Sequence, residues 1–132
     1  MQEIDKLAWL HIKDKKVLGA RSKGKTTIYL PGGKREIGES DEVALSREIR
    51  EELSVELIPA TIKYINTFVA QADGNPIGTM VRMACYHAEF RGTITAAAEI
   101  EEVVWMSYLD RENCSIGGKI ILDWLKGKGM IA

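Results

Sequence analysis

The stretch from residue 31 to residue 55, PGGKREIGESDEVALSREIREELSV, constrains the fold more than any other part of the chain. It opens with Gly32 and Gly33, and paired glycines permit a tight turn and a close approach of the backbone to a ligand. Ser40 is a typical helix N-cap, and the acidic residues that follow it suit the first turn of a helix. The stretch therefore predicts a glycine-rich loop that leads directly into a helix.

The predicted helix carries an apolar stripe with carboxylates beside it. The stripe has residues at i, i+4 and i+8: Leu45, Ile49 and Leu53. Glu48, Glu51 and Glu52 lie together next to the stripe, and like charges at these spacings repel by roughly 0.2–0.5 kcal/mol per pair. Carboxylate oxygens suit Mg²⁺ or Mn²⁺, so the cluster indicates a cation site. On the carboxylates alone, a solvated acidic face paired by Arg47 and Arg50 explains the pattern equally well.

The spacing over the whole stretch decides between these interpretations. Gly33 is followed after five residues by Glu39, and after seven more by the run RE-I-REE at residues 47–52. This arrangement resembles the Nudix box, with Ser54 in the place where the box has a glycine. The resemblance implies a single Nudix hydrolase domain over residues 1–132. It also implies an α+β fold, an α/β/α sandwich whose mixed sheet lies between the box helix and a C-terminal helix.

The rest of the chain is rich in strand-like runs. The predicted strands are residues 7–12, 17–21, 26–30, 55–72, 77–90 and 103–106. We expect the first two to form a hairpin, and the fourth and fifth a long hairpin through a turn at residues 73–76. Residues 91–102 are predicted as a loop, and residues 115–126 as the C-terminal helix.

Composition bounds the class of protein. The 132 residues have a net charge of −1 and a pI near 6.1, so nothing indicates bulk binding to nucleic acid or to an anionic membrane. Cys85 and Cys114 lack any CxxC spacing, which favours free thiols in a reducing compartment. The first residues resemble neither a signal peptide nor a membrane span, and we expect a cytoplasmic protein.

The resemblance assigns roles to the box residues. A Nudix-like site hydrolyses a nucleoside diphosphate linked to another group, with the help of Mg²⁺ or Mn²⁺. It implies that Glu51 and Glu52 are the principal metal ligands and that Glu48 is a further ligand or the general base. Arg47 is expected to orient a carboxylate through a charge-assisted hydrogen bond, without contacting the substrate.

Further candidates lie around the box. The carbonyl of Gly32 or Gly33 is a candidate metal ligand, and Glu39 at the helix start is a ligand or a support. The family often takes its base from a loop outside the box, and here Glu99 or Glu102 is the candidate. A solvated acidic loop explains either of these two residues equally well.

Candidate substrate contacts are weaker. Tyr29 is placed to stack on a base, although strand packing explains it as well. Lys34 and Arg35 are candidate phosphate contacts, although exposed loop cations are common. We assign no role to His11 or His87.

The resemblance narrows the substrate only by elimination. Some relatives that cleave ADP-ribose carry a proline about sixteen residues past the box, and residues 68–71, which lie there, contain none. We therefore expect a MutT-like enzyme that converts a (d)NTP, oxidised purine nucleotides included, to the monophosphate and pyrophosphate. The alternatives are hydrolysis of ADP-ribose or nucleotide sugars, and a non-catalytic domain that senses a nucleotide. The only partner expected is a small nucleotide, bound by a monomer or a homodimer.

Overall fold

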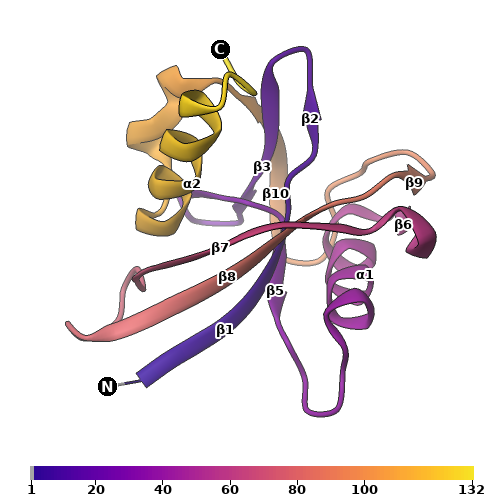
Figure 1. Ribbon diagram of the computed structural model, residues 1–132, viewed down its shortest axis with the longest axis horizontal. Helices are drawn as coiled ribbons and strands as arrows, with labels where there is room; N and C mark the ends of the chain where they lie inside the picture. Colours follow the sequence, from indigo (N-terminus) through magenta and orange to yellow (C-terminus); the bar gives the residue numbers. More distant parts are fainter. Residues whose placement is uncertain (1) are drawn as a thin grey trace.

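A computed structural model describes residues 2–132, and its centre is a four-stranded mixed sheet (Figure 1). The strand order is β5 (Gly32–Lys34), β1 (Gln2–Trp9), β8 (Thr79–His87) and β7 (Lys63–Gln71). Strand β1 is parallel to β8 and antiparallel to β5, while β7 and β8 form an antiparallel hairpin. The glycine loop is thus itself the edge strand of the main sheet.

A second sheet has the order β10 (Ile100–Met106), β3 (Lys16–Ser22) and β2 (Ile12–Lys13). The short β4 (Ile28–Tyr29) also pairs with β3. A separate pair joins β6 (Glu56–Leu57) to β9 (Phe90–Arg91). Two 3₁₀ helices, η1 (Pro59–Thr61) and η2 (Tyr108–Asn113), precede β7 and the last helix.

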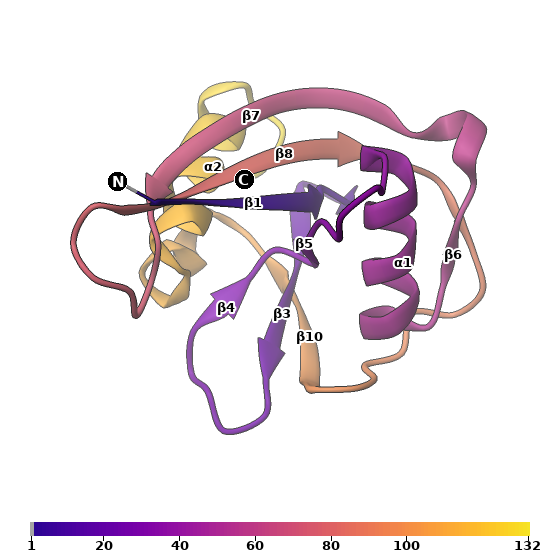
Figure 2. The ribbon, with the colours of Figure 1, turned by 90° about the horizontal axis from the view of Figure 1, so that it is seen from below.

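Helices α1 (Asp41–Leu53) and α2 (Ile116–Gly127) lie on opposite sides of the main sheet (Figures 1 and 2). Successive side chains of β1 alternate between two cores. Leu7 and Trp9 pack in the core of α1, whereas Ala8 and Leu10 pack in the core of α2. The predicted α/β/α sandwich with a mixed sheet is confirmed.

The box helix forms as its sequence predicts. Ser40 Oγ accepts a hydrogen bond from the N–H of Val43 at 3.2 Å and caps the helix start. The stripe residues are fully buried: Leu45, Ile49 and Leu53. The helix ends at Ser54 in the left-handed conformation, with φ 62°, where its N–H donates to the carbonyl of Arg50 at 3.1 Å.

Three predictions about strands are wrong in part. The first hairpin is formed by β2 and β3, because β1 ends at Trp9 and pairs with β5 and β8 in the other sheet. The strand predicted at residues 26–30 is reduced to the two residues of β4. The predicted loop 91–102 ends early, since β10 begins at Ile100 and therefore contains Glu101 and Glu102.

The C-terminal helix is confirmed, and the long hairpin is confirmed for β7 and β8. The strands predicted at residues 55–72 and 77–90 are wrong in their outer parts, because η1 interrupts the first and β6 pairs with β9 in a separate sheet. Ser115 Oγ accepts the N–H of Gly118 at 3.0 Å and caps α2. Both cysteines are buried free thiols. Within residues 2–132, no helix combines the length and the apolar character needed to cross a membrane.

Candidate active site

A cleft of about 840 Å³ runs along β1 between the box and the start of α2. Gly32, Gly33, Glu48 and Glu52 line it from the box. The turn between β7 and β8 also lines it, and Figure 2 shows this turn and α1 at opposite ends of β1. The box carboxylates therefore occupy one part of an elongated cleft.

Glu52 is the buried carboxylate of the box. Its residue is only 9% exposed, and Oε1 accepts the backbone N–H of Gly32 at 3.1 Å. The pKa of Glu52 is raised to about 8, chiefly by burial and also by the nearby charges of Glu48 and Glu99, against the effects of the Gly32 hydrogen bond and of Lys6. A carboxylate in this setting favours either a proton or a cation.

The two box glycines are required by close contacts. Gly32 has φ 142°, and a Cβ atom there would lie 2.0 Å from the carbonyl oxygen of Leu7 in β1. A Cβ atom at Gly33 would lie 2.5 Å from the carboxylate of Glu48. The loop is therefore held directly between β1 and the carboxylate face of α1.

Arg47 organises the outer side of the box. Its guanidinium makes two hydrogen bonds to Glu39, at 2.7 Å and 2.9 Å, and one to Glu48 at 2.9 Å. It also donates to the carbonyl of Lys34 at 3.1 Å. The hydrogen bonds from Arg47 lower the pKa of Glu39 to about 2. Glu39 is thus paired within the protein, and its geometry is that of a support.

Glu48 and Glu51 differ in their surroundings. Burial raises the pKa of Glu48, against the hydrogen bond from Arg47 and with the charges of Glu51 and Glu99. The side chain of Glu51 is 57% exposed and lies 3.7 Å from Arg47. Glu51 faces solvent at the rim, whereas Glu48 lines the cleft.

Glu99 is brought to the box by a tightly held turn. Its side chain lines the cleft, and its carbonyl accepts the N–H of Lys23 at 2.8 Å. The adjoining backbone is tied to α1, since Ala97 N–H donates to the carbonyl of Glu52 at 2.9 Å and Thr95 N–H to that of Leu53 at 2.9 Å. The last turn of α1 thus fixes the loop that carries Glu99.

The other loop candidate, Glu102, is not brought to the box. It lies on β10, is 53% exposed and forms an ion pair with Arg21 at 2.9 Å. It does not line the cleft. Geometry therefore separates two residues that the sequence left equivalent.

Only some of the candidate substrate contacts lie in the cleft. Tyr29 and Lys34 line the cleft. Arg35 does not, because its guanidinium bridges the carboxylates of Asp5 and Asp41. Arg35 therefore acts in the structure as a link between β1 and the start of α1.

Lys6 and Asp73 are charged cleft residues that the sequence analysis did not single out. The ammonium of Lys6 lies 5.8 Å from the ring centroid of Tyr29, and Asp73 Oδ1 accepts the N–H of Ile116 at 2.8 Å. A signal for Lys6 was present in the sequence, since this charged residue falls in phase with Ile4 and Ala8 on a core-facing side of its strand.

The donor set fits a hard divalent cation, although it is not a closed ligand shell. Among residues 2–132, the His, Cys, Asp and Glu side chains form no group of three or more that could hold a metal ion as they stand. Glu48, Glu52 and Glu99 nevertheless share one region of the cleft: burial raises the pKa of Glu48 and of Glu52, and the charge of Glu99 raises both pKa values as well. Oxygen donors with uncompensated negative charge are the ligands that Mg²⁺ and Mn²⁺ prefer.

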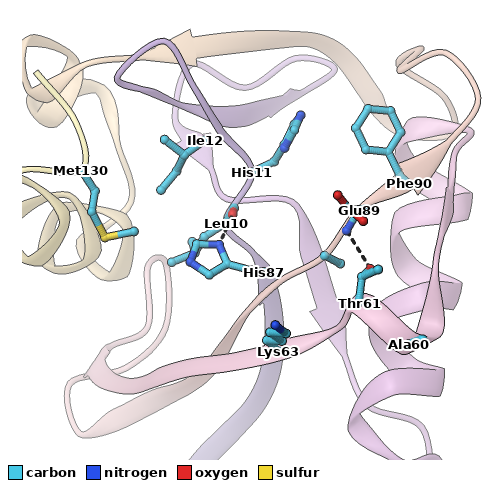
Figure 3. A pocket seen from close by; sticks show the side chains of 11 residues that line it. Leu10, His11, Ile12, Ala60, Thr61, Lys63, His87, Glu89, Phe90 and Met130 are labelled. Carbon is cyan, nitrogen blue, oxygen red and sulfur yellow. Dashed lines mark hydrogen bonds between the residues drawn. The ribbon is translucent and has the colours of Figure 1, made fainter.

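A second cavity, of about 890 Å³, lies away from the box (Figure 3). Both histidines line it, together with Lys63 and Glu89. His87 Nδ1 lies 3.2 Å from the carbonyl of Leu10, and the backbone N–H of Glu89 donates to a threonine hydroxyl. None of the candidate site residues lines this cavity, so the carboxylate chemistry belongs to the first cleft.

Comparison with known proteins agrees with this site. The family model of the NUDIX domain matches residues 6–121, and the chain belongs to the NUDIX family. Members of this family are hydrolases that act on pyrophosphate bonds of small nucleotides and generally use divalent metal ions. The resemblance seen in the sequence is confirmed.

Individual relatives cover most of the chain. The chain is 31% identical over 122 residues to the uncharacterized Nudix hydrolase YvcI of Bacillus subtilis, covering 89% of this chain and 77% of that protein. The solution structure of the E. coli ORF135 protein matches with TM-score 0.74 and 27% identity, covering 97% and 94% of the two chains. A MutT NUDIX hydrolase from Burkholderia pseudomallei has the same fold, with TM-score 0.74, 22% identity and coverages of 93% and 98%.

Proposed function

We propose that this chain, as a single domain, is a Mg²⁺-dependent hydrolase that converts a nucleoside triphosphate to the monophosphate and pyrophosphate. The observation that carries the proposal is the cluster of Glu48, Glu52 and Glu99 against the glycine loop within one elongated cleft. A volume of about 840 Å³ is in the range of small-molecule sites. Mn²⁺ is an alternative metal, and ADP-ribose or a nucleotide sugar is the alternative substrate.

The box residues divide the work of binding. Glu52 and Glu51 would hold the metal, with Glu48 and a carbonyl of the glycine loop as further donors. When bound, Mg²⁺ neutralises phosphate charge and lowers the pKa of a coordinated water. Arg47 donates a hydrogen bond to Glu48 and would keep it in place, and Lys34, which lines the cleft, would attract the phosphates.

Glu99 is the proposed general base for the attacking water. It lines the cleft beside Glu48 and Glu52, whereas Glu102 is paired with Arg21 outside it. General-base catalysis contributes typically 10²–10⁴-fold. Glu99→Gln should therefore lower kcat by about a hundredfold or more, while the matched variant Glu102→Gln should stay within about twofold of the wild type. Equal effects of the two variants on kcat would contradict this assignment.

The substrate is tested by a hydrolysis panel with product identification. Ribo- and deoxynucleoside triphosphates, an oxidised purine triphosphate, ADP-ribose and UDP-glucose would each be incubated with and without Mg²⁺ in ¹⁸O-labelled water. We expect monophosphate and pyrophosphate from the triphosphates only with Mg²⁺, slower cleavage of ADP-ribose, and label in one product. Faster cleavage of ADP-ribose or UDP-glucose than of every triphosphate would overturn the substrate assignment. Nucleotide binding without any hydrolysis would indicate a sensing domain instead.

A further inference from the structure

Beside the glycine loop, the cleft contains a cation, Lys6, that is in register with Lys34 of β5 and has no hydrogen-bond acceptor within residues 2–132. Lys6 is half-buried on β1, on the side that faces the core of α2, and its side chain lines the cleft. Among residues 2–132 its ammonium makes no hydrogen bond or ion pair, and it lies over the ring of Tyr29. Burial lowers the pKa of Lys6, and the charge of Lys34 lowers it further, against the opposing charges of Glu52, Asp73 and Glu48. A ligand with a hydrogen-bond acceptor would complete this site.

Asp73 supplies the opposite chemistry in the same cleft. Its Oδ1 accepts the N–H of Ile116 at 2.8 Å, while Oδ2 has no partner in the described part of the chain. Asp73 and Lys6 both line the cleft but form no ion pair with each other. An ammonium is donor-only and a carboxylate is acceptor-only, so the pair requires a ligand edge that carries one acceptor and one donor.

The same cleft also has apolar lining residues. They come from β1 and β8 and from the positions that directly follow β4 and β7: Ile4, Leu30, Ala72, Val81 and Met83. Gly117 at the start of α2 leaves only backbone there, since a Cβ atom would lie 2.6 Å from Met83 Cε. A planar heterocycle with polar edges matches such a surface, and Tyr29 at the rim offers an aromatic face.

We infer, on the basis of the proposed function, that Lys6 and Asp73 select the nucleobase of the substrate. Lys6 donates to a ring carbonyl oxygen, and Asp73 Oδ2 accepts a hydrogen bond from an exocyclic amino group. Cytosine and guanine carry both groups, whereas uracil, thymine and hypoxanthine lack the amino group and adenine lacks the carbonyl. The cleft therefore favours an amino-bearing, carbonyl-bearing base.

The test uses substrate pairs that differ in one group. We would measure kcat/KM for dCTP against dUTP and for dGTP against dITP. We expect at least a tenfold preference for the amino-bearing member in one pair or both, because a substrate without the amino group leaves the Asp73 acceptor unpaired in the complex. The two pairs distinguish cytosine from guanine as the favoured base.

Asp73→Asn replaces a hydrogen-bond acceptor, Oδ2, with a donor, the amide NH₂ group. The asparagine oxygen retains the bond to Ile116, and Ser115 still caps α2, so the fold should persist. The new amide group is a donor, so the preference should disappear or turn toward dUTP and dITP. Asp14→Asn, at an exposed turn, should leave the ratios unchanged.

Lys6→Met tests the carbonyl contact. It should raise KM for dCTP and dGTP by about tenfold or more while kcat/KM for dATP, which offers no carbonyl, changes little. Lys23→Met is the matched control, since Lys23 is exposed and outside the cleft lining. A general loss of structure would lower kcat/KM equally for dCTP, dGTP and dATP and would also lower the melting temperature.

The two proposals fail in different ways. If triphosphates are hydrolysed but Asp73→Asn leaves both substrate ratios unchanged, base selection is overturned and the proposed function stands. If the wild type hydrolyses no triphosphate, the proposed function fails, and equilibrium dialysis of dCMP, dUMP, dGMP and dIMP with the metal-free protein decides base selection. Tighter binding of dCMP or dGMP that Asp73→Asn abolishes would support the inference, and equal binding of all four would overturn it.

Discussion

The box has an outer rim, which carries Arg47, Glu39 and Glu51, and an inner wall, which carries Glu48 and Glu52. The surroundings of Glu39 at the rim and of Glu52 on the wall shift the pKa of a carboxylate in opposite directions. At the rim, Arg47 donates two hydrogen bonds to Glu39 and lowers the pKa of Glu39 to about 2. On the wall, Glu52 receives one backbone N–H, and burial raises the pKa of Glu52 to about 8. One motif thus contains a carboxylate that the protein has already neutralised and one that it leaves for a ligand.

The largest expected effect comes from removing the wall carboxylate. Glu52→Gln should lower kcat by at least about a hundredfold, because it deletes a metal-binding charge while retaining the shape and the Gly32 hydrogen bond. Glu51→Gln should lower kcat less, since Glu51 is 57% exposed at the rim. The measurement is triphosphate hydrolysis at millimolar Mg²⁺, with Glu56→Gln, an exposed residue outside the box, as control. Near-normal turnover of both box variants would show that the metal site is elsewhere.

Weakening the hydrogen bonds of Arg47 at the rim should lower activity less, and a higher Mg²⁺ concentration should restore it. Arg47→Lys removes the planar fork that holds Glu39 and Glu48 together, and such supporting contacts typically contribute 10–100-fold. We expect the Mg²⁺ concentration for half-maximal activity to rise by about tenfold, with the maximum rate largely recovered at high Mg²⁺. Arg50→Lys, at an exposed neighbouring position, is the matched control. An Arg47→Lys variant with unchanged Mg²⁺ dependence would mean that Arg47 does not position Glu48 for metal binding.

The wall carboxylate also predicts how stability depends on pH in the metal-free protein. The folded-state pKa of Glu52 is raised from the ordinary glutamate value of 4.5 to about 8. The folded protein therefore binds a proton that the unfolded chain releases between these values. This stabilisation is complete below pH 4.5 and is lost as the pH rises through 8, with a slope of at most about 1.4 kcal/mol per pH unit.

Urea unfolding with a chelator at pH 5.5, 6.5 and 7.5 measures this slope. The difference in unfolding free energy between wild type and Glu52→Gln isolates Glu52, because the titration of His11 is common to both proteins. We expect Glu52→Gln to gain stability relative to the wild type as the pH rises. A pH-independent difference would show that Glu52 is ionised throughout the folded protein.

The smallest effect concerns the end of the helix that bears both regions. Ser54 has φ 62°, a conformation that costs a residue with a Cβ atom roughly 1 kcal/mol relative to glycine. Ser54→Gly should therefore raise the free energy of unfolding by about 1 kcal/mol and leave kcat unchanged. Thermal and urea unfolding would measure this, and a loss of stability would reveal a bond of the exposed hydroxyl that offsets the strain.

The rim and the helix were predictable because their interactions are local. Ser40 caps the helix through Val43, and Arg47 binds Glu39 within the same motif, so the spacing of the box specifies both. The stripe residues have distant partners, but their periodicity alone predicts which face of the helix is buried. The partners of β1 are not local: Leu7 pairs with Gly33 and Ala84, and nothing near it in the sequence indicates this register. The expected hairpin was wrong for that reason.

The same distinction explains the cleft. Glu99 and Glu102 belong to one acidic run, and the sequence does not distinguish them. Because β10 begins at Ile100, Glu99 precedes the strand and lines the cleft, whereas Glu102 lies on the strand and pairs with Arg21. Lys6 and Asp73 reach one cleft from a strand and a distant turn. Their common role depends on the parallel pairing of β1 with β8, which no short motif encodes.

The backbone bonds from Ala97 and Thr95 to the last turn of α1 have a consequence for transplanting this site. The unit that would need to be moved is discontinuous, since residues 31–55 depend on residues 95–100 for the position of Glu99. A scaffold given the box alone would receive the rim and most of the wall without the candidate base. Natural variation in loop length should therefore concentrate before Thr95, where added residues leave the anchoring bonds intact.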